Sequence, residues 1–177
     1  MSDELTRREA IKLGAAVTVA VSIEGTNAMA QPASFFTREE LALVDELAEM
    51  IIPADDHSPG ARAAKVAAYI DARLAEAFDA ADRTTWRDGL KLIEQLSRQA
   101  SGRAFLESTA AQRLALLERI AAREAKPEKP EEHFFNALKS RVVDAYYTSE
   151  IGIKQEMEYR GNTFQAEFSG IDVSQER

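Results

Sequence analysis

The residues that could carry out chemistry in this 177-residue sequence are few, because it has two histidines, His57 and His133, and no cysteine. Without cysteine there is no disulfide, no thiolate zinc site, no cysteine-ligated iron–sulfur cluster, no C-x-x-C-H haem attachment and no thiol nucleophile. Two histidines cannot supply a three-histidine metal site. Composition alone therefore excludes most metal and covalent chemistry from this chain.

Neither histidine stands in the pattern of a di-metal helical bundle, which needs a Glu-x-x-His pair on each of two helices. The residue three positions before His133 is Pro130, and the residue three positions before His57 is Ala54. The sequence also lacks the G-x-S-x-G, G-x-G-x-x-G and P-loop patterns. We therefore assign no catalytic, cofactor-binding or metal site to the chain, and a hydrolase built on either histidine is the least supported alternative.

Acidic residues accompany both histidines. Asp55-Asp56-His57 is a cluster of hard ligands that could contact a cation, but a solvated turn with Asx-type hydrogen bonds to the backbone is the favoured interpretation. His133 follows Glu131 and Glu132, which are predicted to form an acidic helix start that the helix dipole favours. Neither cluster is counted as a site.

The composition is that of ordinary globular material. The sequence is 45% hydrophobic and 29% charged, and 30 acidic against 22 basic residues give a formal net charge of -8. This negative charge repels a phosphate backbone, which argues against nucleic acid as the main partner. The length fits one domain with an appendage.

Residues 1–30 are predicted to be a twin-arginine export signal, followed by a domain over residues 31–177. Arg7 and Arg8 precede Lys12 and an uncharged stretch from Leu13 to Ile23, and Ala28 and Ala30 then form a small-x-small cleavage pattern in Ala28-Met29-Ala30. Glu24 closes the stretch well before the roughly 20 apolar residues that a membrane span needs. The alternatives are an amphipathic N-terminal helix and a chance pair of arginines.

From residue 37 onward, apolar residues recur at three- and four-residue spacing and no window alternates like a strand, which predicts an all-α bundle of about five helices. Thr37 and Glu40 form a capping box that starts the first helix, and Pro53 ends it. The second helix is expected around residues 66–78. The third contains residues 86–96, with Asp82 as the cap between them.

Two further helices complete the predicted bundle. Thr109 and Gln112 form the capping box of the fourth helix, and Pro130 starts the fifth, which runs to about Tyr147. The apolar residues predicted to face the core across all five helices are Leu41, Val44, Leu47, Ala48, Ile51, Val66, Ile70, Leu74, Phe78, Trp86, Leu90, Ile93, Leu96, Leu114, Leu117, Ile120, Phe134, Leu138, Val142 and Ala145.

The segment from Tyr146 to Ile171 has no helical periodicity and is predicted to be irregular. It holds three tyrosines, three glycines and two phenylalanines. Aromatic side chains on glycine-shaped turns are typical of a binding interface. The alternative is a tail that folds back over the bundle with its tyrosines half-buried and their hydroxyls in water.

Two groups of residues resemble the gluconate 2-dehydrogenase subunit 3 family. The first is Ile51-Ile52-Pro53-Ala54-Asp55 with Ser58-Pro59-Gly60-Ala61 and Val66, and the second is Tyr146-Tyr147-Thr148-Ser149-Glu150-Ile151-Gly152 with Tyr159-Arg160-Gly161-Asn162. The similarity covers about residues 35 to 171. The two groups lie far apart in the chain, so chance agreement is improbable.

This resemblance implies an accessory role. Members of the family are small subunits of membrane-associated sugar and sugar-acid dehydrogenases, in which a flavoprotein of the glucose-methanol-choline (GMC) type holds the FAD and a multihaem cytochrome subunit with haem c takes the electrons. The small subunit is thought to assist maturation and export of the flavoprotein. The resemblance therefore implies a non-catalytic, cofactor-free subunit that is periplasmic, exported by the twin-arginine machinery and membrane-associated through its partners.

The resemblance also directs attention to the second group as the partner-binding surface. Relatives often have Pro-Gly-Cys near the end where this chain has Ser169-Gly170-Ile171, so attachment to the large subunit would be non-covalent. The alternative function is a free-standing exported helical protein that binds a small apolar ligand between its helices. The residues predicted to bind the partner are Tyr146, Tyr147, Glu150, Ile151, Gly152, Tyr159, Gly161 and Asn162.

Overall fold

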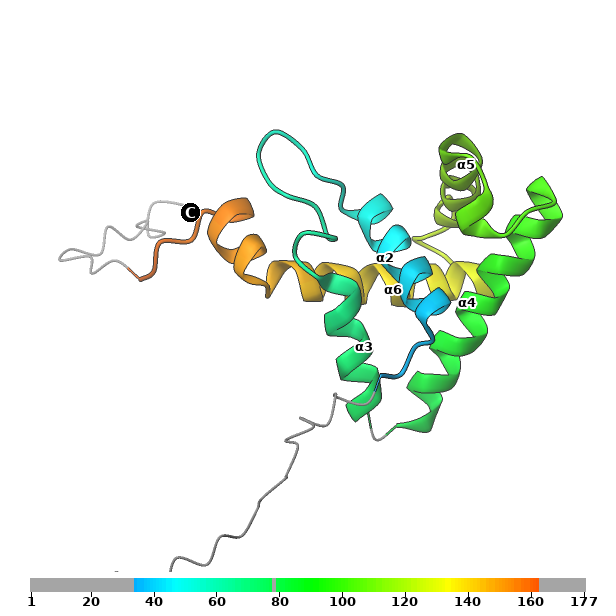
Figure 1. The fold of residues 1–177 in the computed structure, drawn as a ribbon, viewed down its shortest axis with the longest axis horizontal. Coiled ribbons are helices and arrows are strands. Elements are labelled where there is room, and N and C mark those ends of the chain that lie inside the picture. The colour runs from blue at the N-terminus through cyan, green and yellow to red at the C-terminus, as the bar shows by residue number, and fades with distance from the viewer. Residues whose placement is uncertain (1–33, 78, 163–177) are drawn as a thin grey trace, which may run out of the picture. The chain divides into compact units, whose positions relative to one another are not determined.

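The computed structural model of the chain describes residues 34–77 and 79–162, which Figure 1 draws in colour. Several sequence predictions fall on other positions and lie outside the described residues. These are the export signal with Arg7, Arg8, Lys12, Ala28 and Ala30, the core position Phe78 and the aromatic residues after position 162.

Throughout the described residues the regular structure is helical and contains no strand, which confirms the predicted all-α class. None of these helices is both long enough and apolar enough to cross a membrane. The elements are α2 (Arg38–Ile51), α3 (Val66–Glu76), α4 (Ala80–Ser101), a 3₁₀ turn (Phe105–Glu107), α5 (Ala110–Ala121), α6 (Pro130–Tyr147) and a π-helical turn (Gly152–Glu156).

Local sequence signals set the ends of three helices. The Thr37 hydroxyl accepts a hydrogen bond from the Glu40 amide at 3.2 Å and the Glu40 carboxylate accepts one from the Thr37 amide at 2.9 Å, which confirms the predicted capping box of α2. Thr109 and Gln112 form the same pair at the start of α5. Pro130 is the first residue of α6, where its missing N–H costs no helical hydrogen bond.

Two local predictions were wrong. Asp82 does not cap α4, because the helix begins earlier and Asp79 accepts the amide hydrogen bond of Ala81 at 2.8 Å instead. Leu114 does not face the core and is 51% exposed, because the buried face of α5 is centred on Leu116, Leu117 and Ile120. Leu114 lies three residues before the buried Leu117, and a residue at this spacing can also lie at the edge of the buried face of a helix.

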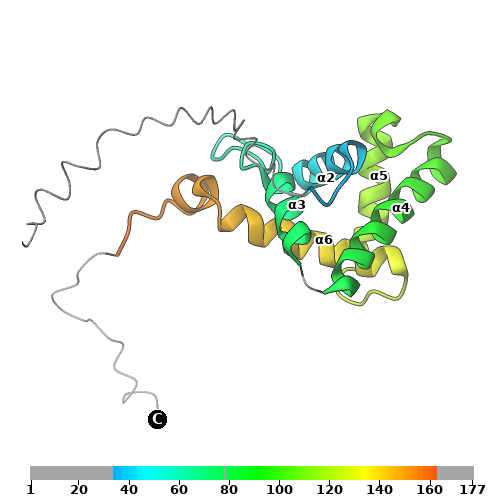
Figure 2. The same cartoon turned by 60° about the horizontal axis from the view of Figure 1, so that its bottom comes forward.

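Helix α6 lies at the centre of the bundle, because it packs against α2, α3, α4 and α5 (Figures 1 and 2). The indole of Trp86 on α4 lies with its ring centroid 5.8 Å from that of Phe134 on α6, at an interplanar angle of 88°. A Cβ atom at Gly89 would lie 2.0 Å from the Phe134 ring, so the glycine permits this close approach of α4 and α6.

Most of the predicted core positions are buried. Leu41, Ile51 and Leu96 are only partly buried and pack against the core from its edge. The predicted positions that are buried are Val44, Leu47, Ala48, Val66, Ile70, Leu74, Trp86, Leu90, Ile93, Leu117, Ile120, Phe134, Leu138, Val142 and Ala145.

Candidate functional site

The two groups of family-like residues meet at the C-terminal end of α6. In Figure 1 the loop between α2 and α3 and the orange segment after α6 both lie at this end. The contact is direct, since the His57 ring nitrogen Nε2 lies 3.1 Å from the backbone carbonyl oxygen of Glu156. Residues that are 99 positions apart in the chain are thus brought together.

Tyr146 fixes the loop to the end of α6. Its side chain is 1% exposed, and its hydroxyl donates a hydrogen bond to the Pro59 carbonyl at 2.7 Å. The hydroxyl also lies 2.6 Å from the hydroxyl of Ser58, which is itself buried. Because Tyr146 is enclosed, it cannot present its ring to a partner, and the prediction is corrected to a supporting role beneath the surface.

The loop between α2 and α3 is held in shape by carboxylates. The Asp55 carboxylate accepts hydrogen bonds from the amides of His57 at 2.9 Å and Ser58 at 2.8 Å, which confirms the predicted Asx-type turn. These two hydrogen bonds hold the pKa of Asp55 below its usual value. Glu49 at the end of α2 accepts the Arg62 amide at 2.8 Å and so anchors the other side of the loop.

The segment after α6 is helical from residue 150 to residue 156, so its predicted irregularity was wrong there. The Met157 amide donates to the Gly152 carbonyl at 2.9 Å, which is the five-residue spacing of a π-helix. Gly152 is buried, and a Cβ atom there would lie 2.1 Å from the backbone carbonyl oxygen of Tyr146. This glycine serves close packing of the segment against α6 and does not form a turn.

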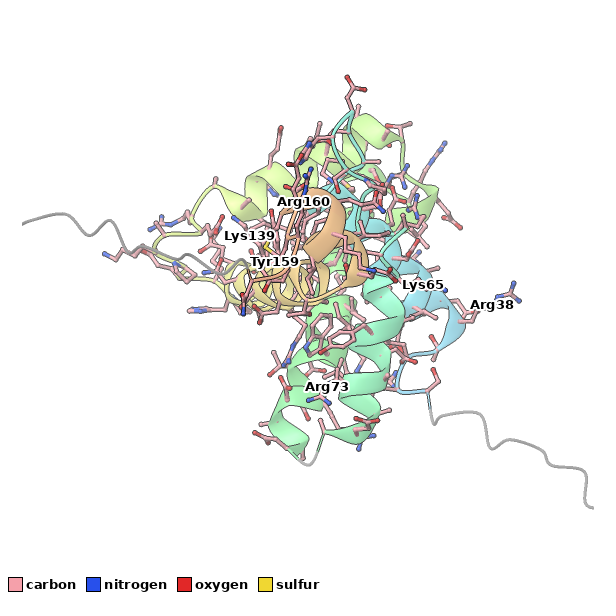
Figure 3. The ribbon with its side chains drawn as sticks, turned by 90° about the vertical axis from the view of Figure 1, so that its left-hand side faces the viewer. Arg38, Lys65, Arg73, Lys139, Tyr159 and Arg160 are labelled. Carbon is pink, nitrogen blue, oxygen red and sulfur yellow. The ribbon has the colours of Figure 1, made fainter. Side chains whose placement is uncertain are left out.

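Exposed aromatic and apolar side chains lie at the end of α6 and along the segment that follows it. Tyr147 is 38% exposed, Met157 49% and Tyr159 52%. The Tyr159 hydroxyl donates to the Asn162 side-chain oxygen at 2.8 Å. Partial burial and the nearby Glu156 carboxylate raise the pKa of Tyr147. Figure 3 views the molecule from this end, with Tyr159 labelled.

The predicted partner-binding residues therefore divide into two sets. Three are supports: Tyr146 and Gly152 are buried, and Ile151 is partly buried against the core. Glu150 is exposed and pairs with Lys154 at 2.7 Å. The predicted residues with exposed positions are Tyr147, Glu150, Tyr159, Gly161 and Asn162. Their role in binding a partner stays a prediction.

His57 was missed as a member of this surface, because no local pattern in the sequence signals a contact across so many residues. The structure surrounds its ring with negative groups. The hydrogen bond to the Glu156 carbonyl, followed by the carboxylates of Glu156, Glu158 and Asp55, raises the pKa of His57 above its ordinary value. The protonated ring therefore strengthens the link between the loop and the segment after α6.

The contact between the loop and the segment is expected to weaken as the pH rises. A raised folded-state pKa means that the stabilisation is fully present below the unfolded value of about 6.5 and is lost as the pH rises through the folded pKa. An NMR titration of the His57 ring protons should give a midpoint above 6.5, and Glu158→Gln should lower that midpoint. A midpoint at or below the ordinary value would contradict the arrangement.

The rest of the described structure was searched for a metal site and for a ligand-binding groove. No group of three or more histidine, aspartate or glutamate side chains in residues 34–77 and 79–162 is arranged to hold a metal ion. A groove of about 550 Å³ lies between α2, α4 and the 3₁₀ turn, with Leu43, Leu90 and Leu106 among its lining residues and several charged side chains beside them. Neither family-like group lines this groove, which is where an apolar ligand of the alternative function would bind.

Comparison with known proteins identifies the family. The family model described as gluconate 2-dehydrogenase subunit 3 matches residues 38–164. This range includes both groups of family-like residues. No curated protein and no solved structure matches the chain. Because the match spans well over half of the 177 residues, the chain belongs to the gluconate 2-dehydrogenase subunit 3 family.

Proposed function

We propose that this chain is the non-catalytic small subunit of a periplasmic, flavin-dependent dehydrogenase complex, and that it escorts the folded flavoprotein subunit through twin-arginine export and stabilises it. The coarser statement, an accessory subunit of a dehydrogenase complex, follows the family. The observation that supports it best is the convergence of both family-like groups at one end of α6, where Tyr147, Met157 and Tyr159 are exposed.

Such a surface has the chemistry of a protein interface. Tyrosine and methionine are enriched at the cores of interfaces, and tyrosine loses little conformational entropy on binding. The surface is also supported from below, because the buried Tyr146 hydroxyl and the glycine contact of Gly152 fix the loop and the segment to α6. A surface held in place before binding loses less entropy when the partner docks.

The proposed partner is a GMC-type flavoprotein that carries FAD, with a multihaem cytochrome c subunit as a further member of the complex. Oxidation of the sugar or sugar acid is assigned to the flavoprotein, and this chain supplies no cysteine and only two histidines for chemistry of its own. FAD is inserted where it is made, so the loaded flavoprotein must be exported folded. This chain, bound to the flavoprotein and carrying Arg7 and Arg8 in its own signal, would direct both chains to the twin-arginine machinery.

Deleting residues 2 to 30 tests the escort role. We expect the shortened chain to bind the flavoprotein in the cytoplasm, and both chains to be absent from the periplasmic fraction, because the proposed escort has lost its export signal. Cell fractionation followed by dye-linked dehydrogenase assays measures this. Replacing Arg7 and Arg8 with lysine is the matched control for loss of the signal without loss of chain length. An active flavoprotein in the periplasm of the deletion strain would overturn the escort role.

A further inference from the structure

The loop between α2 and α3 forms the second half of the surface at the end of α6. Its tip is linked to the segment after α6 by the His57 contact with the Glu156 carbonyl at 3.1 Å. Two residues further along, the loop is linked to α6 by the Tyr146 hydrogen bond to the Pro59 carbonyl at 2.7 Å. With two such links the loop tip and the segment present their outer side chains together. We call the set Asp55, Asp56, His57, Tyr147, Glu156, Met157, Glu158 and Tyr159 the composite surface, in which every residue is exposed except Glu156, which is partly buried.

The charge of the composite surface is negative. The loop and the segment bring acidic residues near one another, because Asp55 lies two residues before His57, the His57 ring contacts the Glu156 backbone, and Glu158 follows two residues later. The adjacent Asp56 is exposed. Carboxylates that gather on an exposed surface repel one another unless a positive partner neutralises them.

The neighbouring cations do not balance this charge. Lys154 is paired with Glu150 at 2.7 Å, and Lys139 is paired with Glu124 at 2.7 Å. Arg160 follows the segment, and Figure 3 shows it at the same end of the molecule as Tyr159. Four carboxylates face two positive groups, Arg160 and the protonated His57 ring, so the surface keeps a net negative charge.

The aromatic side chains suit the same partner chemistry. The ring quadrupole gives the faces of Tyr147 and Tyr159 a partial negative charge. These faces therefore attract cations, above all the planar guanidinium of arginine. Carboxylates bind the same guanidinium through two parallel hydrogen bonds. Two independent features of the composite surface, its carboxylates and its exposed tyrosines, therefore favour one kind of side chain.

We infer that the composite surface, loop included, docks onto an arginine-rich patch of the dehydrogenase subunit, with guanidinium groups against the carboxylates and their aliphatic stems against Tyr147, Met157 and Tyr159. This inference rests on the proposed function. It adds the loop to the interface and specifies the partner chemistry as basic.

The experiment measures the dissociation constant of the complex between the full chain and the flavoprotein at low and high salt. The double charge reversal Asp56→Lys/Glu158→Lys is expected to weaken binding at least tenfold at 50 mM NaCl, and the difference should shrink at 500 mM NaCl, where the Debye length is only a few ångström. The matched control Asp88→Lys/Glu118→Lys changes the same charge at exposed positions of α4 and α5. It should alter binding by less than about twofold.

The outcomes of this experiment distinguish failure of the basic-patch inference from failure of the proposed function. If Tyr159→Ala weakens the complex but the charge reversal leaves it unchanged or tightens it, the basic-patch inference is overturned and the accessory role stands. If no flavoprotein binds the wild-type chain, both are overturned. Equal circular dichroism spectra of the variants establish that a loss of affinity does not come from unfolding.

Discussion

Replacing Gly152 with alanine is expected to detach the segment after α6 from the helix end and to weaken partner binding more than any exposed side-chain variant. A Cβ atom at this position would lie 2.1 Å from the Tyr146 carbonyl oxygen and 2.8 Å from its carbonyl carbon. Both are backbone atoms, which cannot rotate away as a side chain can. Alanine elsewhere in a helix stabilises it by up to about 1 kcal/mol relative to glycine, so a loss here isolates the clash.

The loss should fall at or above the upper end of the roughly 1–3 kcal/mol that overpacking a closely packed site costs. Hydrogen exchange measures it directly, because the amides of Met157 and Tyr159 donate within the segment to Gly152 and Ile153. Both amides should lose protection while those of α4 keep theirs. Gly102→Ala is the control for backbone strain without a clash, since Gly102 has a φ of 73° and no atom within 4 Å of the added Cβ. It should cost about 1 kcal/mol at the end of α4 and leave the protection of residues 152–159 unchanged. Unchanged protection of residues 152–159 would contradict this packing.

Replacing Trp86 with alanine is expected to remove a large part of the free energy of unfolding. The side chain is 1% exposed, and its ring centroid lies 5.8 Å from those of both Phe36 and Phe134. Removing a buried tryptophan costs about 3–5 kcal/mol through lost burial and the cavity left behind. Globular domains are stable by only about 5–15 kcal/mol, so the variant should be marginal.

Thermal unfolding followed by circular dichroism is the measurement, since Trp86 is the single tryptophan and its removal abolishes the tryptophan fluorescence. The Tm should fall by on the order of 10 °C. Leu114→Ala removes a 51% exposed side chain from α5 and should change the free energy of unfolding by less than about 0.5 kcal/mol. A similar small change for Trp86→Ala would mean that α4 and α6 do not share this core.

The helices themselves were predictable because their signals are local. Thr37 with Glu40, Thr109 with Gln112, and Pro130 act within one turn of the chain, and each gives the helix end that the structure shows. The predicted start of α4 was wrong, because two nearby aspartates could each cap the helix. Asp79 and Asp82 are both of a residue type that caps helices, and in the structure it is Asp79 that accepts the Ala81 amide.

The surface was predictable in outline only. The aromatic content of the segment after α6 pointed to it, but glycine was interpreted as a turn residue when Gly152 serves close packing. Tyr146 was assigned to the partner-binding surface from the aromatic composition of its segment and from the family resemblance, and neither distinguishes the last buried position of α6 from the first exposed one. The contact of His57 with Glu156 joins residues far apart in the chain, and pairings of that kind leave no trace in the spacing of residues within one helix.

The most direct test of the accessory role is calorimetric titration of a purified flavin-dependent dehydrogenase, obtained by co-purification with the tagged full chain, with the wild-type chain and with its Tyr147→Ala/Tyr159→Ala variant. The variant should bind at least about 30-fold more weakly, because each exposed tyrosine that anchors an interface contributes more than about 1 kcal/mol. Equal dissociation constants for the two chains, or no binding by the wild type, would contradict the account.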